Sequence, residues 1–152
     1  MSIKDLTVVT ITYNNEHELI KTYRSLYYFR SKGGKHIIIN GGESVANIML
    51  NDVTLIEEPD NGIYEALNKG ISQVKTSFFM LIHSGDIFLA KIDKMIALLN
   101  KMNNEGIDIL INDCSIEFGK TNRLMKSSYW KPWMFKLGAQ PPHPPVVYKT
   151  KS

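Results

Sequence analysis

Short apolar runs alternate with amphipathic stretches along the first 112 residues of the chain. The apolar, β-branched runs predict β-strands over residues 7–12, 36–39, 53–57, 77–82 and 108–112. Between them, apolar residues at helical spacing predict helices over 15–29, 45–50, 63–74 and 92–102. Strand and helix alternate about four times, which is typical of a mostly parallel sheet with helices on both faces. The chain is therefore expected to have an α/β fold.

Polar residues follow four of these predicted strands. They are Tyr13–Asn14, Asn40–Gly42, Glu58–Asp60 and His83–Asp86. Because parallel sheets bind ligands at the carboxyl ends of their strands, we expect these residues to share one rim and to form a ligand site.

The pattern changes after residue 118. Cys114–Phe118 is predicted to form one side of a hairpin whose tip is "FGKTNR", and beyond it the periodicity fades. The run "QPPHPPV" has four prolines in seven residues and is expected to be irregular. We therefore divide the chain into a core, 1–118, and a basic, aromatic and proline-rich segment, 119–152.

The charge is distributed unevenly between these two parts. Residues 120–152 contain seven of the 18 basic residues and none of the 15 acidic ones. Together with the aromatic residues at 129, 130, 133 and 135, this basic charge suits contact with an anionic lipid surface or a diphosphate. The alternative is a solvated loop in which acidic residues happen to be absent. Nucleic acid is not expected, because the core is acidic and carries no nucleic-acid-binding motif.

Several protein classes are excluded by what the sequence lacks. No apolar run approaches the roughly 20 residues of a membrane span, and the start of the chain has no signal-peptide pattern. The single Cys114 excludes an internal disulfide framework, so a reducing, cytoplasmic location is expected. The glycine-rich phosphate loops, the G-x-S-x-G elbow and C-x-x-C are all absent. His17 and His36 lie in ordinary helix and strand contexts and are expected to be structural.

Candidate chemistry is concentrated in "LIHSGDIF", residues 81–88. Asp86 is a single carboxylate just beyond a buried strand, and Gly85 allows close backbone approach. Such an acid suits a divalent metal that bridges phosphate oxygens. The alternative is structural, with Ser84 or Asp86 capping a turn.

Three other polar residues have both a functional and a structural interpretation. Tyr13 suits stacking on a flat base, or packing at the rim. Asn40 suits pairing with a base edge, or a strand–helix turn. Asn68 lies beside the apolar face of a helix and either contacts a ligand or satisfies a loop carbonyl.

Four stretches together resemble a known family. In order and spacing, "TVVTITYNN", "IIINGGES", "EEPDNGIYEALNKGIS" and "FFMLIHSGDIF" resemble the family 2 glycosyltransferases with the Rossmann-like GT-A fold. They look closest to the bacterial branch that builds O-antigen, colanic acid and capsule repeats. The resemblance covers roughly residues 5–90, and it is looser from 108 to 148.

The resemblance implies roles for particular residues. Asp86 falls where the family holds Mn²⁺ or Mg²⁺ against the nucleotide diphosphate, and Ser84 falls where many members have a first Asp. Thr12 and Tyr13 fall where the family holds uracil. Asn40 stands where members have a base-binding Asp.

Two further residues and a departure complete this comparison. Asp60 matches a nucleotide-contacting acid, and His143 falls near the diphosphate or metal. Members of this branch commonly run longer and take their general base from a later segment, whereas this chain has no acid after Glu117. Asp113 is the late acid available as a substitute. The resemblance therefore implies a C-terminally truncated chain that binds donor without efficient turnover.

The expected function is inverting transfer of a sugar from a UDP-sugar to a lipid-linked saccharide acceptor. It would serve surface polysaccharide synthesis at the inner face of the plasma membrane. One alternative is a nucleotidyltransferase, although the acidic "YNNEHE" replaces the glycine-rich, basic loop usual there. The other is a non-catalytic nucleotide- or glycan-binding module.

Overall fold

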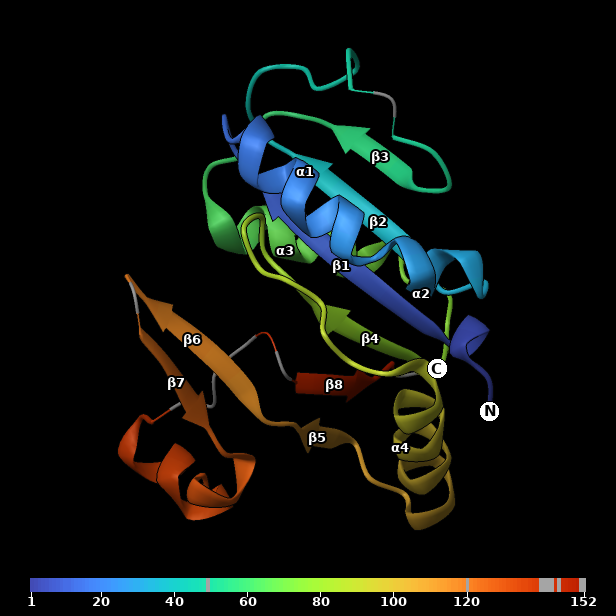
Figure 1. The fold of residues 1–152 in the computed structure, drawn as a ribbon, viewed down its shortest axis with the longest axis vertical. Coiled ribbons are helices and arrows are strands. Elements are labelled where there is room, and N and C mark those ends of the chain that lie inside the picture. The colour runs from blue at the N-terminus through green and yellow to red at the C-terminus, as the bar shows by residue number, and fades with distance from the viewer. Residues whose placement is uncertain (49, 120, 140–143, 145, 151–152) are drawn as a thin grey trace.

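A six-stranded sheet with the order β3-β2-β1-β4-β8-β5 forms the centre of the computed structural model (Figure 1). The structure describes residues 1–48, 50–119, 121–139, 144 and 146–150. The strands of this sheet are β1 (Leu6–Thr12), β2 (Lys35–Asn40), β3 (Thr54–Glu57), β4 (Phe78–Leu81), β5 (Ile109–Ile111) and β8 (Val146–Lys149). β1 to β4 are parallel, and β8 runs antiparallel to both of its neighbours.

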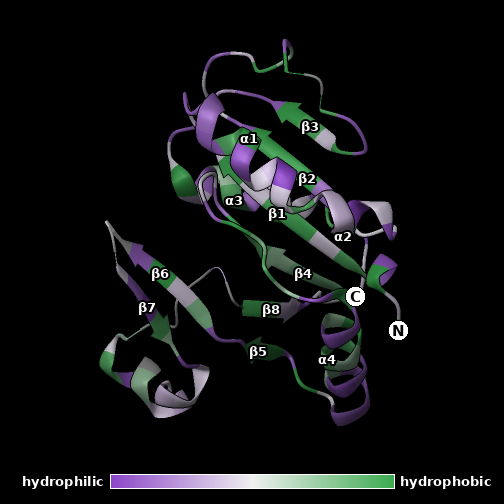
Figure 2. Cartoon of the chain, in the orientation of Figure 1, coloured by the Kyte–Doolittle hydropathy of each residue, from purple (hydrophilic) through white to green (hydrophobic). Residues whose placement is uncertain are grey.

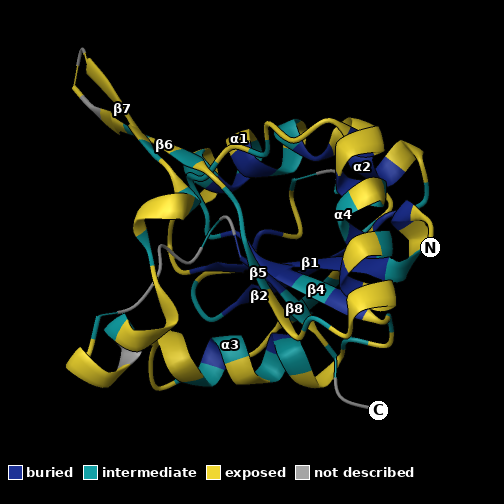
Figure 3. Cartoon of the chain, turned by 90° about the horizontal axis from the view of Figure 1, so that it is seen from below, coloured by how far each residue is buried: buried dark blue, intermediate teal, exposed yellow. Residues whose placement is uncertain are grey.

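Helices cover both faces of this sheet, as the sequence pattern predicts. They are α1 (Glu16–Ser25), α2 (Tyr27–Ser31), α3 (Ile63–Ser72) and α4 (Ile92–Glu105), with short 3₁₀ turns at Ile3–Asp5, Ser127–Tyr129 and Pro132–Leu137. Figure 3 shows α3 on one face and α1, α2 and α4 on the other. All seven residues of β1 are buried, because this strand lies in the interior of the sheet with helices on both sides.

The period-2 alternation of the strands divides the core into two sides. Val8 of β1 packs with Phe78, Met95 and Leu99 toward α4. Val9, the next residue, packs with Ala66 on the α3 side. The green strands and the purple outer surface of α4 in Figure 2 show the same separation of apolar and polar residues.

Helix α3 approaches β1 closely at a glycine. A Cβ atom built on Gly70 would meet the side chain of Val9. Glycine at this buried helical position therefore lets α3 lie directly on the strand.

The predicted hairpin is confirmed. Strands β6 (Cys114–Phe118) and β7 (Thr121–Met125) form a separate two-stranded sheet that extends away from the main one (Figure 1). The predicted strands and the helices over 63–74 and 92–102 are also found, within a few residues at each end.

Three predictions of local structure are corrected. The described residues of the stretch 45–50 form turns and loop and no helix. The buried side chain of Val45 packs this stretch against Leu19 and Ile38. The predicted helix 15–29 is two helices, because Leu26 leaves helical geometry between α1 and α2. The run "QPPHPPV" is expected to be irregular, yet its last residue, Val146, begins strand β8, where Val146 and Val147 are fully buried.

Candidate functional site

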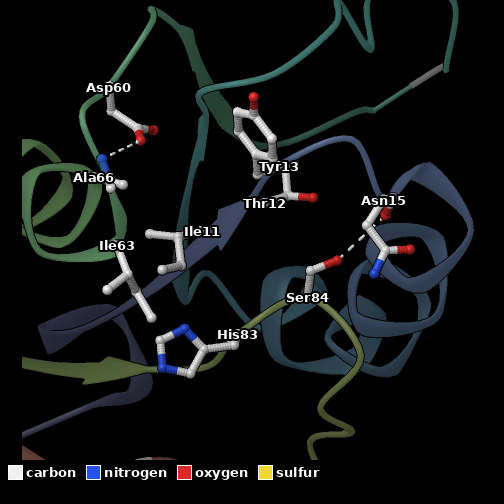
Figure 4. Close-up of a pocket in the computed structure, with 10 residues that line it drawn as sticks. Ile11, Thr12, Tyr13, Asn15, Asp60, Ile63, Ala66, His83 and Ser84 are labelled. Carbon is white, nitrogen blue, oxygen red and sulfur yellow. Dashed lines mark hydrogen bonds between the residues drawn. The ribbon is translucent and has the colours of Figure 1, made fainter.

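A cavity of about 570 Å³ opens at the carboxyl ends of β1 and β4 (Figure 4). It is lined by Ile11, Thr12, Tyr13, Asn15, Asp60, Gly62, Ile63, Ala66, His83 and Ser84. This is the edge at which the sequence pattern predicts a ligand site. Of the predicted site residues, the structure brings Thr12, Tyr13, Asp60 and Ser84 together here.

Thr12 and Tyr13 present opposite kinds of surface to this cavity. Thr12 is buried, and its hydroxyl oxygen has no hydrogen-bond partner within the described part of the chain. The Tyr13 side chain is 65% exposed. An unsatisfied buried hydroxyl beside an open aromatic ring offers a ligand one hydrogen bond and one flat apolar contact.

Ser84 follows β4 and hydrogen-bonds to β1 through its backbone at the edge of the cavity. Its backbone N–H donates to the Ile11 carbonyl at 3.1 Å, and its hydroxyl lies 3.4 Å from the Asn15 carbonyl. The second contact is long, so the hydroxyl remains available to a better acceptor.

Asp86 closes the turn that follows β4. Its Oδ2 accepts the backbone N–H of His83 at 3.0 Å, and its carbonyl accepts the Thr22 hydroxyl at 2.8 Å. Gly85 takes φ 102° within this turn and donates its N–H to the Thr22 oxygen at 2.9 Å. Asp86 thus has the turn-capping role of the structural alternative, and partial burial raises the pKa of its carboxyl.

The side chains present here fit a metal only if a ligand completes its coordination. Among the described residues, no group of three His, Cys, Asp or Glu side chains gathers closely enough to hold an ion. The other carboxylate oxygen of Asp86, Oδ1, forms no hydrogen bond with the described residues, which leaves it available. Magnesium-type ions are often held by one or two carboxylates together with substrate phosphates.

Asp60 fixes the loop on the α3 side of the cavity. Its Oδ1 accepts the Gly62 N–H at 3.0 Å, and a Cβ atom on Gly41 would collide with the same carboxylate. The loops after β2 and β3 therefore touch at Gly41, and this contact positions Asp60.

Asn40 does not line the cavity. It is 1% exposed, and its amide nitrogen donates to the Glu43 carbonyl at 2.7 Å and to Glu57 Oε1 at 3.1 Å. Its amide oxygen accepts the Gly42 N–H at 3.1 Å. These contacts give Asn40 a structural role in the loop beside the site, whereas its pairing with a base edge stays a prediction.

The remaining predicted residues lie elsewhere or outside the described residues. Asn68 is exposed on α3 and does not line the cavity. Asp113 is also away from the cavity, where it accepts the backbone N–H and the hydroxyl of Ser127 at 2.7 and 2.9 Å. These two hydrogen bonds lower the pKa of Asp113, which makes it a weaker base. His143 lies outside the described residues.

Sequence reasoning missed the apolar wall of the cavity. Ile63 and Ala66, from the first turn of α3, form this wall. Asn15, at the start of α1, is a polar lining residue that was missed as well. The i, i+3 spacing of Ile63 and Ala66 places them on one face, which is the signal that could have identified this wall.

The fold and this cavity define a Rossmann-like α/β domain whose ligand site lies at the carboxyl edge of a mostly parallel sheet. The family model "Glycosyl transferase family 2" matches residues 7–150, and the chain belongs to this family. It is 32% identical over 94 residues to uncharacterized glycosyltransferases from two strains of Mycobacterium tuberculosis. The match covers 57% of this chain and 36% of theirs, so the chain spans about a third of these relatives.

Solved structures share the fold. S. aureus TarS 1–349 in complex with UDP-GlcNAc has a TM-score of 0.70 at 13% identity, covering 99% of this chain and 46% of that one. The UDP complex of the same protein gives 0.68 at 15% identity, with 99% and 47% covered. The mannosyltransferase PcManGT from Pyrobaculum calidifontis, in complex with GDP-Man and Mn²⁺, gives 0.58 at 13% identity, with 71% and 35% covered. The expected GT-A fold is confirmed.

No helix among the described residues is both long enough and apolar enough to cross a membrane.

Proposed function

We propose that the cavity binds a UDP-sugar and that the whole protein transfers its sugar, with inversion, to a lipid-linked saccharide acceptor. The observation that carries this proposal is the unpartnered Thr12 hydroxyl beside the exposed Tyr13 ring in a cavity at the carboxyl edge. Family membership and the UDP and UDP-GlcNAc complexes of TarS, a protein of the same fold, support it.

Four of the cavity residues have a proposed role in donor binding. The Tyr13 ring stacks on the uracil, and the Thr12 hydroxyl hydrogen-bonds to its edge. Asp60 accepts a hydrogen bond from the nucleoside, since a carboxylate is an acceptor. The Ser84 hydroxyl donates to the diphosphate.

We propose that Asp86 holds a Mn²⁺ or Mg²⁺ ion through its available carboxylate oxygen. The Mn²⁺ in the PcManGT complex supports a divalent ion. If bound there with the donor, such an ion would offset the negative charge that develops on the departing diphosphate.

The proposed acceptor side is the basic segment 119–152, and its described residues between 126 and 137 include many exposed side chains. Trp133 is 58% exposed and Leu137 is 76% exposed. Lys131 and Lys136, which are close to them in the sequence, are exposed as well. Basic and aromatic side chains together suit a lipid diphosphate at the surface of an anionic membrane. These side chains support peripheral contact with the inner face of the plasma membrane. A part in O-antigen-like polysaccharide synthesis is proposed from the sequence resemblance alone.

Turnover by this chain alone is proposed to be poor. Inverting transfer needs a base that takes the proton of the acceptor hydroxyl. Asp113 is held by Ser127 away from the cavity, so it is badly placed for that role. The same observation favours the second candidate, a binding module without catalysis.

The first experiment is thermal unfolding of this chain with UDP, GDP or ADP, each with and without Mn²⁺. A ligand at 100 times its Kd adds about 2.7 kcal/mol, which is a shift of about 5–10 °C for a domain of this size. Asp86→Asn is the test variant, because an amide oxygen can still accept the His83 N–H while the charge is lost. Asp93→Asn, exposed in the first turn of α4, is the matched control.

The outcomes separate the candidates. A UDP-selective shift that needs Mn²⁺ and is lost only in Asp86→Asn supports the donor site and its ion. A shift that needs no metal, with no transfer by a longer form of the protein, favours the binding module. No shift with any of the nucleotides would contradict the donor site.

A further inference from the structure

A second hollow, of about 510 Å³, lies at the opposite edge of the sheet from the donor cavity. It is lined by Arg30, Ser31, Lys35, His36, Asp52, Val53 and Thr54. Lys35 begins β2 and Thr54 begins β3, so the hollow lies at the amino ends of these strands. From His36 to Asn40, at the other end of β2, the strand covers about 13 Å, so the two sites are separate.

His36 is a buried side chain with one unused ring nitrogen. It is 2% exposed, and its Nε2 lies 2.9 Å from the Thr10 hydroxyl. Its Nδ1 has no hydrogen-bond partner among the described residues. Burial, and then the charge of Arg30, lower the pKa of His36 to about 3, so the ring is neutral at pH 7. A buried, unsatisfied polar group of this kind indicates a missing water or ion.

Arg30 brings a positive charge to the same place. It is 7% exposed, and its guanidinium carbon lies 3.9 Å from the centre of the Tyr23 ring. Its Nη1 donates to the Tyr23 carbonyl at 2.7 Å, and among the described residues Tyr23 is the one partner with which its guanidinium forms hydrogen bonds. Several of its five N–H donors therefore remain unused.

Two other charged side chains line the hollow. Lys35 is exposed and forms no ion pair with the described residues. Asp52 is the one acid of the lining. Burial lowers the pKa of Arg30, and the charge of Asp52 offsets part of this effect without a direct ion pair among the described residues. The lining thus carries two cations and one anion, and its excess charge is positive.

We propose that this hollow is an anion site that binds phosphate. The unused N–H groups of Arg30 match two phosphate oxygens, and Lys35 supplies a second positive charge. If the Thr10 hydroxyl donates to Nε2, the neutral His36 ring carries its proton on Nδ1 and has a third donor for the ion. The site joins α2 to the amino ends of β2 and β3. It is independent of the donor cavity, and it does not depend on the function proposed for that cavity.

The test follows the ¹⁵N chemical shifts of the His36 ring by NMR while inorganic phosphate is added to the whole chain at pH 7. Sodium chloride at equal ionic strength is the control titration. Phosphate is expected to shift the His36 signals saturably. Lys35→Gln should weaken binding about fivefold, the upper range for an exposed charge. Asp52→Asn removes the repelling carboxylate and should tighten binding. Asparagine tolerates the positive φ of 58° found at Asp52.

Matched controls keep the result interpretable. Lys101→Gln removes an exposed charge from α4 and should bind phosphate as the unmodified chain does. UDP, with its own phosphates, should leave the His36 signals unchanged at concentrations that fill the donor cavity. A His36 response equal for phosphate and chloride, or one unaffected by both Lys35→Gln and Asp52→Asn, would overturn the proposal. So would the absence of any His36 response to phosphate.

Discussion

The side-chain amide of Asn40 donates to the Glu57 carboxylate at 3.1 Å and so ties the ends of β2 and β3 together. Glu57 also accepts the Val45 N–H at 2.7 Å and the Ser44 hydroxyl at 3.0 Å. The hydrogen bonds from Val45, Asn40 and Ser44, in that order of effect, lower the pKa of Glu57. One buried amide and one carboxylate therefore hold the loop beside the donor cavity.

This arrangement predicts the effect of placing an acid at position 40. Asn40→Asp keeps an acceptor for the Gly42 N–H but loses the donor to Glu57 and sets two carboxylates against each other. We expect the free energy of unfolding to fall by about 1–3 kcal/mol in urea denaturation at pH 7, without a gain in UDP affinity. Asn47→Asp, exposed in the same loop, is the control and should change stability little. Tighter UDP binding by Asn40→Asp would argue for direct base contact instead.

Thr12→Val separates a ligand contact from a structural one. Because the Thr12 hydroxyl has no partner among the described residues, replacing it with a methyl group should leave stability unchanged or slightly raised. Loss of one hydrogen bond to the nucleotide should weaken UDP binding about five- to tenfold, measured by calorimetry. Thr54→Val, at the exposed start of β3, should leave UDP binding unchanged. Unchanged UDP affinity in Thr12→Val would remove this hydroxyl from the proposed site.

Gly70→Ala tests the close contact between α3 and β1. The added methyl group meets the Val9 side chain, and overpacking of this kind costs about 1–3 kcal/mol. The better helix propensity of alanine offsets about 1 kcal/mol of this cost. We therefore expect a lower free energy of unfolding, measured by thermal or urea unfolding. Ser72→Ala, exposed on the same helix, should not destabilise the chain. An unchanged or higher melting temperature in Gly70→Ala would show that α3 can move off the strand.

His36 makes stability depend on acid. Its pKa falls from 6.5 to about 3 on folding, so between these values the unfolded chain binds more protons than the folded one. The contribution of His36 to the free energy of unfolding is at its full value above about pH 6.5, and it is lost as the pH falls toward 3. Between pH 7 and 4.5 the loss is about 2.5 kcal/mol.

Urea unfolding at several pH values measures this effect. His36→Gln should remove the His36 contribution to the pH dependence, whereas His17→Gln, on the exposed surface of α1, should retain it. If His36→Gln does not fold, NMR titration of the unmodified chain gives the same information. A His36 ring that takes up a proton near pH 6.5 would contradict the prediction.

Local patterns were sufficient for most of the fold. The buried strands, the helices α3 and α4 and the β6–β7 hairpin follow from residue periodicity and turn chemistry alone. Strand β8 does not, because "VVYK" is short and follows several prolines, and its burial comes from β4 and β5, which lie far away in the sequence. The helix predicted over 45–50 is wrong for a related reason: a carboxylate on β3, Glu57, accepts the backbone N–H of Val45 at the start of this stretch.

For the site too, one part could be predicted from the sequence and another could not. Strand ends could be recognised, so Thr12, Tyr13, Asp60 and Ser84 were placed correctly at one cavity. The direction of a side chain could not be read from its position. Asn40 ends β2 and Asp86 follows β4, yet the side chain of the first is turned into its own loop and that of the second caps its own turn. Their partners are set by tertiary contacts that no spacing rule describes.

Strand β8 also affects the order in which the chain can fold. Met80 of β4 pairs with Val147, and β5 joins the sheet through β8 alone. Until residues 146–149 arrive, β4 therefore has an open edge and β5 has no neighbour. Closing a loop of more than 60 residues is slow compared with local helix formation. The first three strands and their helices can thus assemble early, while one edge stays exposed to pairing with other chains until the last described strand is inserted.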